Sequence, residues 1–228
     1  MSDYLPLLSR MVPSSLFHAI RDAKVNMKRF MEDIGFSALH SVNIDTLPNR
    51  LARFVVRAFD KESYNFNLKT GVVHVTAEKV HEILGLPIGG VSLYDLPQRS
   101  EDDEFVQLWL SQFAPKKKNK IFATDIAEKL VCSTSVDFMF KVNFLMLFAN
   151  VMGNANTMRA FVNLSVVRRI REDTNIARVD WCDFIHRSLA ISHEPNTVKG
   201  FYNGPLCFLI VSVNIFSLPY LILFFLHV

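Results

Sequence analysis

The sequence has few cysteines, and their arrangement excludes two common kinds of site. The three residues Cys132, Cys182 and Cys207 are far apart and form no closely spaced pair. A disulfide framework and a structural zinc site both need paired cysteines, so we expect neither, and no bound metal or other cofactor. Free thiols indicate a reducing compartment, nuclear or cytoplasmic.

The chain also lacks a strong charge bias and an abundance of flexible residues. It has 25 Lys and Arg against 22 Asp and Glu, a formal net charge of +3, so that any basic surface has to be local. Only 8 Gly and 9 Pro occur in 228 residues, which argues against a disordered chain. The first residues include Asp3 and lack the apolar stretch of a secretory signal.

Hydrophobic residues, by contrast, are abundant and recur with helical spacing. Half of the sequence is hydrophobic, and phenylalanine alone contributes 20 residues. Apolar residues three and four apart predict helices over 14–34, 47–60, 101–113 and 136–152, the last capped by Ser135 and apolar on nearly every side. Weaker patterns predict helices over 124–130 (capped by Thr124), 160–171 and 179–190.

Two of these predictions specify which side chains are buried. In helix 47–60 we expect Leu51, Phe54, Val55, Ala58 and Phe59 to face the core and three arginines to face solvent, namely Arg50, Arg53 and Arg57. In helix 101–113 the expected inward residues are Phe105, Leu108, Trp109 and Phe113.

Between Tyr64 and Thr76 the apolar period changes to two, which predicts a β-hairpin that turns at 69–71. Thr76 is placed to cap a short helix, and Gly85 to end it. The sequence therefore predicts a mainly α, multi-helix globular domain with one hairpin and a C-terminal apolar helix.

The lysines of one predicted loop and the arginines of a predicted helix are the candidate contact residues for nucleic acid or another partner. They are Lys116, Lys117, Lys118 and Lys120, next to Phe122, together with Arg168, Arg169 and Arg171. No aromatic platform or recognition-helix pattern accompanies these charges, so a solvated loop and a solvated helix face are the alternative interpretation.

No set of residues has the spacing of a catalytic or metal site. Cys182 and His186 would share a helix face, but zinc needs further ligands, and a thiol nucleophile needs oxyanion donors and a third orienting group. A packed cysteine beside Trp181 is the favoured interpretation. The glycine-rich run 85–90 lacks the spacing of a phosphate-binding loop and follows a helix, so we interpret it as a helix stop and a turn.

The order of motifs resembles a known plant family. VxxILGLPIGG at 80–90, VDWCDFIHRSLA at 179–190 and FYNGPLCFLI at 201–210 are its most specific parts. The sequence is similar over 14–210 to the plant mobile domain, also called aminotransferase-like, and to the N-terminal region of plant ubiquitin-like (SUMO-type) protease family proteins. The resemblance implies a transposon-derived, helix-rich module whose longer relatives carry protease chemistry in a separate C-terminal domain.

Residues 1–13 are then an N-terminal tail, and 211–228 an apolar tail that departs from the family pattern. The uncharged run 205–228 contains Asn214 and Pro219, and it is explained by a truncated gene model, a buried helix or a C-terminal membrane anchor. We expect a non-catalytic interaction or scaffold module with a protein partner and, as a further candidate, a nucleic acid. The alternatives are an N-terminal fragment of a SUMO-type cysteine protease and a tail-anchored membrane protein.

Overall fold

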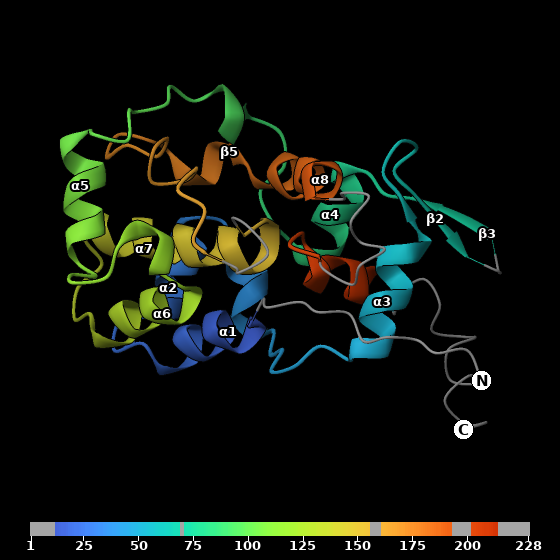
Figure 1. Cartoon of the computed structure of the whole chain (residues 1–228), viewed down its shortest axis with the longest axis horizontal. Coiled ribbons are helices and arrows are strands. Elements are labelled where there is room, and N and C mark those ends of the chain that lie inside the picture. Colours follow the sequence, from blue (N-terminus) through green and yellow to red (C-terminus); the bar gives the residue numbers. More distant parts are fainter. Residues whose placement is uncertain (1–11, 69–70, 156–160, 193–201, 214–228) are drawn as a thin grey trace.

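The computed structural model describes residues 12–68, 71–155, 161–192 and 202–213, which form a mainly α domain (Figure 1). The helices are α1 (Pro13–Asp22), α2 (Met27–Asp33), α3 (Asn49–Ala58), α4 (Ala77–Leu84), α5 (Glu104–Ser111), α6 (Ala123–Cys132), α7 (Phe138–Phe148) and α8 (Trp181–Ser192). The strands are β1 (Phe59–Asp60), β2 (Asn65–Leu68), β3 (Gly71–His74), β4 (Val91–Ser92) and β5 (Val179–Asp180). Single helical turns lie at Ser37–Ser41, Leu93–Asp95, Lys118–Lys120, Ala149–Gly153 and Ile176–Arg178.

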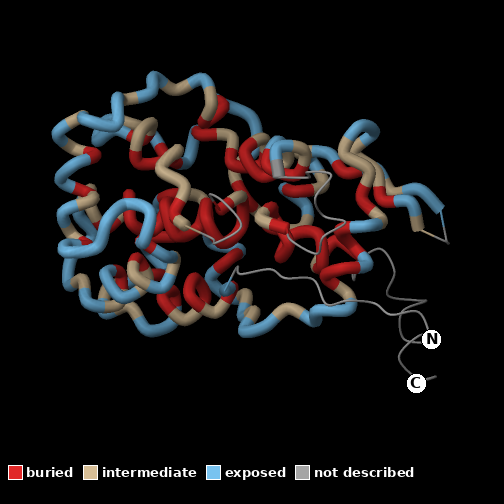
Figure 2. The backbone as a smooth tube through the Cα atoms, in the orientation of Figure 1, coloured by how far each residue is buried: buried red, intermediate tan, exposed pale blue. Residues whose placement is uncertain are grey.

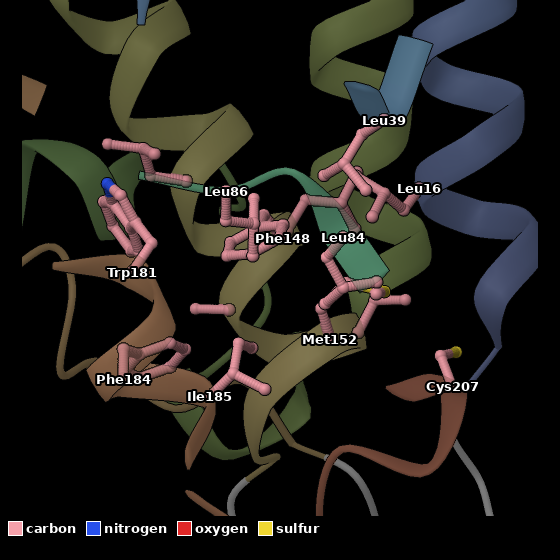
Figure 3. Close-up of a cluster of buried hydrophobic side chains, with 14 of the residues drawn as sticks. Leu16, Leu39, Leu84, Leu86, Phe148, Met152, Trp181, Phe184, Ile185 and Cys207 are labelled. Atoms are coloured by element: carbon pink, nitrogen blue, oxygen red, sulfur yellow. The ribbon is translucent and has the colours of Figure 1, made fainter. Parts of the chain in front are cut away.

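Helix α7 lies in the middle of the core, as its apolar sequence predicts. Every residue from Val142 to Phe148 is buried, and the buried positions concentrate inside the ring of exposed loops in Figure 2. Phe148 packs edge-to-face on Trp181 of α8 at 5.7 Å between ring centroids. Figure 3 shows Leu84 of α4 and Ile185 of α8 in the same cluster, so residues far apart in the sequence share one core.

The predicted hairpin is confirmed, and it gains a third strand. β2 pairs antiparallel with β3, with Phe66 opposite Val73, and β1 adds to the other edge of β2. Phe66 is fully buried, which anchors the sheet to the core. The turn residues 69 and 70 lie outside the described residues.

A two-residue parallel bridge joins β4 to β5 and brings the glycine-rich run against the start of α8. The backbone N–H of Gly89 donates to Asp180 Oδ2 at 2.9 Å, and that of Cys182 donates to the Pro87 carbonyl at 3.2 Å. Gly90 has a φ of +123°, and a Cβ there would collide with the carbonyl oxygen of Arg178. The run is therefore a turn and a close backbone contact, as well as the helix stop that we predicted at Gly85 (φ +61°).

The predicted helix 14–34 is two helices, so that prediction was wrong at its centre. The chain leaves helical geometry at Ala23, whose ψ is 140°, and α2 begins four residues later. Asn26 Oδ1 accepts a hydrogen bond from the N–H of Arg29 at 3.0 Å and so caps α2. A capping asparagine competes with a continuous helix because its side chain replaces a backbone acceptor.

The buried face predicted for α3 was wrong in part. Phe54 is 50% exposed, whereas Arg53 is buried together with Ala52, Val55 and Val56. Val55 and Phe59 belong to the predicted stripe and are buried as expected, but Ala52 and Val56 share their helical spacing, so the buried face is rotated toward these two residues.

Three further local predictions were wrong. Leu108 is 57% exposed on α5, although Trp109 and Phe113 are buried as expected. Helix α7 is capped by Asp137, whose Oδ1 accepts from the Phe140 N–H at 2.7 Å, and not by Ser135. Helix α6 begins before Thr124, which lies inside the helix and does not cap it.

No helix forms over 161–171, the described part of the helix predicted at 160–171. The N–H of Asn163 donates to Asn150 Oδ1 at 2.7 Å, and Asn163 Oδ1 accepts from the Ser165 N–H at 2.9 Å. These side-chain bonds to the backbone offer an alternative to helical hydrogen bonds and hold the segment in successive turns.

Residues 206–213 form a helix after Pro205, and all of them except Val211 are buried. The apolar tail predicted at 211–228 lies otherwise outside the described residues. Within the described ranges, no helix combines the length and the apolar character needed to cross a membrane.

Candidate nucleic-acid interface

The predicted basic loop connects α5 to α6 and exposes all four of its lysines. Lys116 Nζ lies 2.5 Å from Asp125 Oδ1, near the start of α6. Lys118 forms an ion pair with Glu101, which precedes α5. Lys117 and Lys120 have no ion-pair partner among the described residues. Two of the four charges are thus tied to acids, and two are available to a ligand.

The second basic segment lies in the turns before β5, and two of its three arginines hold the fold. Arg168 Nε donates to the carbonyl of Arg99 at 2.9 Å. Arg169 donates to the Ser165 carbonyl at 3.2 Å, and its guanidinium lies 5.8 Å from the ring centroid of Tyr94. Arg171 is exposed and has no ion-pair partner within the described ranges.

Glu101 brings the two basic segments together. Its carboxylate pairs with Lys118 and also lies 3.8 Å from Arg168 Nη1. The two cations come from segments about 50 residues apart, and both segments lie at the α5 end of the molecule, on the left in Figure 1. The hydrogen bond and charge of Lys118, followed by the charge of Arg168, lower the pKa of the Glu101 carboxyl. We call Lys117, Lys118, Lys120, Arg168 and Arg171 the basic face.

Arg99 joins the start of α5 to the second basic segment, and sequence reasoning missed it. Its Nη1 donates to the carbonyls of Ile170 (2.7 Å) and Val167 (3.2 Å), and its Nε lies 3.5 Å from Asp103 Oδ1. Burial, followed by the charge of Arg171, lowers the pKa of Arg99. No sequence signal distinguishes this arginine, because its acceptors are backbone carbonyls in a segment that follows it by about 70 residues.

Cys182 and His186 stand on one face of α8 as predicted, but each is bonded to a backbone carbonyl. The buried Cys182 Sγ donates to the Leu86 carbonyl at 3.4 Å, and burial raises its thiol pKa to about 12. His186 Nε2 lies 3.1 Å from the Val75 carbonyl, its ring stacks on Tyr64 at 4.2 Å, and burial lowers its pKa. A thiol with a raised pKa is a poor nucleophile, so these contacts favour structural roles for both residues.

The other candidate features among the described residues are one cavity and the acidic side chains. A cavity of about 270 Å³ opens where α1 and α3 begin, but its one carboxylate, Asp45, bonds to His18 Nε2 at 2.9 Å. In the part of the chain that the structure describes, no group of three or more His, Cys, Asp or Glu side chains is placed to hold a metal ion. The basic face is therefore the candidate site.

Fold and site together define a mainly α domain with a basic face assembled from two separate segments. The chain belongs to a family described as a domain of unknown function, DUF8566, whose model matches residues 9–210. Neither the curated proteins nor the solved structures contain a match.

Proposed function

We propose that this chain is a non-catalytic interaction module that binds nucleic acid through the basic face. The observation that carries the proposal is the convergence of Lys118 and Arg168 on the exposed carboxylate of Glu101. Two segments distant in sequence thereby present cations on one surface, and phosphates bind to such surfaces by releasing counterions.

The unpaired cations make this surface suited to a polyanion. Lys117, Lys120 and Arg171 are exposed and have no ion-pair partner among the described residues. Glu172 and Asp173 directly follow Arg171 in sequence, and the net charge of the chain is only +3, so attraction acts over a short range and depends on salt. The resemblance to plant mobile domains supports an interaction module from a transposon-derived protein.

Fluorescence anisotropy with labelled DNA and RNA over a salt series tests the proposal. We expect the original chain to bind and its affinity to fall as salt rises. A variant in which Gln replaces Lys117, Lys118 and Lys120 should bind more weakly, with a shallower dependence of affinity on salt concentration. The matched control removes three positive charges at the α3 end of the molecule, at Arg50, Arg57 and Lys61, and should leave binding unchanged (Figure 1). Absence of binding at low salt would refute the proposal.

The non-catalytic part of the proposal has its own test, which uses a SUMO-fusion substrate. Because Cys182 donates to a backbone carbonyl and its pKa is raised to about 12, we expect no cleavage by the purified chain. Cleavage that disappears in a Cys182→Ser variant would contradict the proposal and favour the protease alternative.

A further inference from the structure

A pair of aromatic rings, one of them exposed, follows the basic loop. Phe122 follows the lysines and is 39% exposed. Its ring centroid is 5.4 Å from that of the half-buried Phe161, with the two planes inclined by 45°. Phe161 belongs to the segment that leads to the second basic cluster, so this pair connects the same two parts of the chain as Glu101 does.

Hydrogen bonds fix the backbone on both sides of this pair. The N–H of Phe122 donates to Asp125 Oδ2 at 3.0 Å, and the other oxygen of Asp125 accepts from Lys116. The carbonyl of Ile121 accepts from the N–H of Val162 at 3.1 Å. A ring on a fixed backbone loses little conformational freedom on binding, which favours contact with a planar ligand.

We infer that the ligand of the basic face is single-stranded nucleic acid, one of whose bases stacks on Phe122. This inference rests on the proposed function. Lys120 lies two residues and Lys117 five residues before the ring, and both are exposed without an ion-pair partner among the described residues, so they are available to contact phosphates of the strand whose base stacks there. Duplex bases are already stacked on each other, whereas unpaired bases present their faces to aromatic side chains.

The test compares a labelled oligothymidylate with a duplex of the same length by fluorescence anisotropy. We expect tighter binding of the single strand, and Phe122→Ala should weaken it roughly fivefold to 150-fold, the range for loss of one stacked base. The salt slope should stay unchanged because no charge is removed. Phe122→Trp should retain binding, whereas Phe122→Leu should not, which separates stacking from simple apolar contact.

The control variant is Leu108→Ala, which removes another large apolar side chain that is 57% exposed, and it should change affinity less than twofold. Far-UV circular dichroism checks that each variant is folded. Equal binding of single strand and duplex, unaffected by Phe122→Ala, would overturn the inference and leave the proposed function standing. Absence of binding to either probe at low salt would instead remove the proposed function itself.

Discussion

The side chain of Asn143 is central to the polar contacts inside this apolar core, and its replacement by Leu should destabilise the protein strongly. Asn143 is 2% exposed, and its Oδ1 accepts from Trp109 Nε1 at 2.7 Å. Its Nδ2 donates to Gln112 Oε1 at 3.0 Å. Leucine has a similar size but no polar atoms, so the indole N–H would be left buried without an acceptor.

An orphaned buried donor costs about 1–3 kcal/mol, and the lost bond to the half-buried Gln112 adds about 1 kcal/mol. We therefore expect Asn143→Leu to lower the free energy of unfolding by about 2–4 kcal/mol. For a chain of this length, that corresponds to a fall in Tm of about 4–16 °C. Urea unfolding followed by far-UV circular dichroism measures the change without relying on Trp109 fluorescence.

A double-mutant cycle identifies the cause of the loss. In a Trp109→Phe background there is no indole N–H to orphan, so Asn143→Leu should cost about 1–3 kcal/mol less than in the original chain. Equal costs in the two backgrounds, within about 0.5 kcal/mol, would refute this explanation.

Three further predictions concern the bridge between β4 and β5, the basic face and α8. Gly90→Ala should lower the free energy of unfolding more than Gly71→Ala, as measured by chemical denaturation of both variants. Both glycines have positive φ, but only Gly90 lies close to another backbone segment. Equal losses would contradict this reasoning. Glu101→Gln should tighten nucleic-acid binding in the anisotropy assay because it removes a negative charge and releases Lys118, and weaker binding would show that the carboxylate organises the face. His186 has a lowered pKa in the folded state, so the unfolded chain takes up its proton first as pH falls. The stability that neutral His186 contributes is therefore complete above about pH 6.5 and is lost below it. Between pH 7 and pH 5, the free energy of unfolding should fall more for the original chain than for His186→Phe, and equal falls would rule this contribution out.

The parts of the fold that the sequence predicted depend on local signals. Helix α4 has a capping threonine, Thr76, whose Oγ1 accepts from the Lys79 N–H at 3.3 Å, and it ends at Gly85 in the left-handed conformation. The alternating residues of the hairpin bury Phe66, and the apolar run of α7 is buried. In each case, neighbours in the sequence determine the structure, and distant residues only add to it.

The errors arose where distant contacts decide between local alternatives. The apolar residues of helix α3 span more than one face, and only packing against the rest of the core determines that Phe54 is exposed and Val56 buried. Residues 161–171 contain helix-forming residues, but Asn150, which follows the long central helix, accepts from the Asn163 N–H and favours turns. Such contacts have no signature in the segment that they reshape.

The same distinction applies to the candidate site. A run of lysines predicts an exposed loop because charged side chains avoid burial, and the structure confirms that exposure. The meeting of Lys118 with Arg168 at Glu101, and of Phe122 with Phe161, depends on the fold and could not be predicted from either segment alone.

The intramolecular contacts of the basic residues change what their number implies about binding. Lys116, Arg168 and Arg169 are bonded to other groups of the protein. Lys117, Lys120 and Arg171 have no ion-pair partner in the described ranges and are available to phosphates, with Lys118 as a fourth once Glu101 releases it. For single strands the logarithm of the binding constant falls with the logarithm of salt concentration by about 0.7 per phosphate contact, so three or four contacts give a slope of about −2 to −3. All seven predicted cations would give about −5. A slope near the larger value would mean that the ligand opens the contacts of Arg168 and Arg169, which would require the turns before β5 to rearrange on binding.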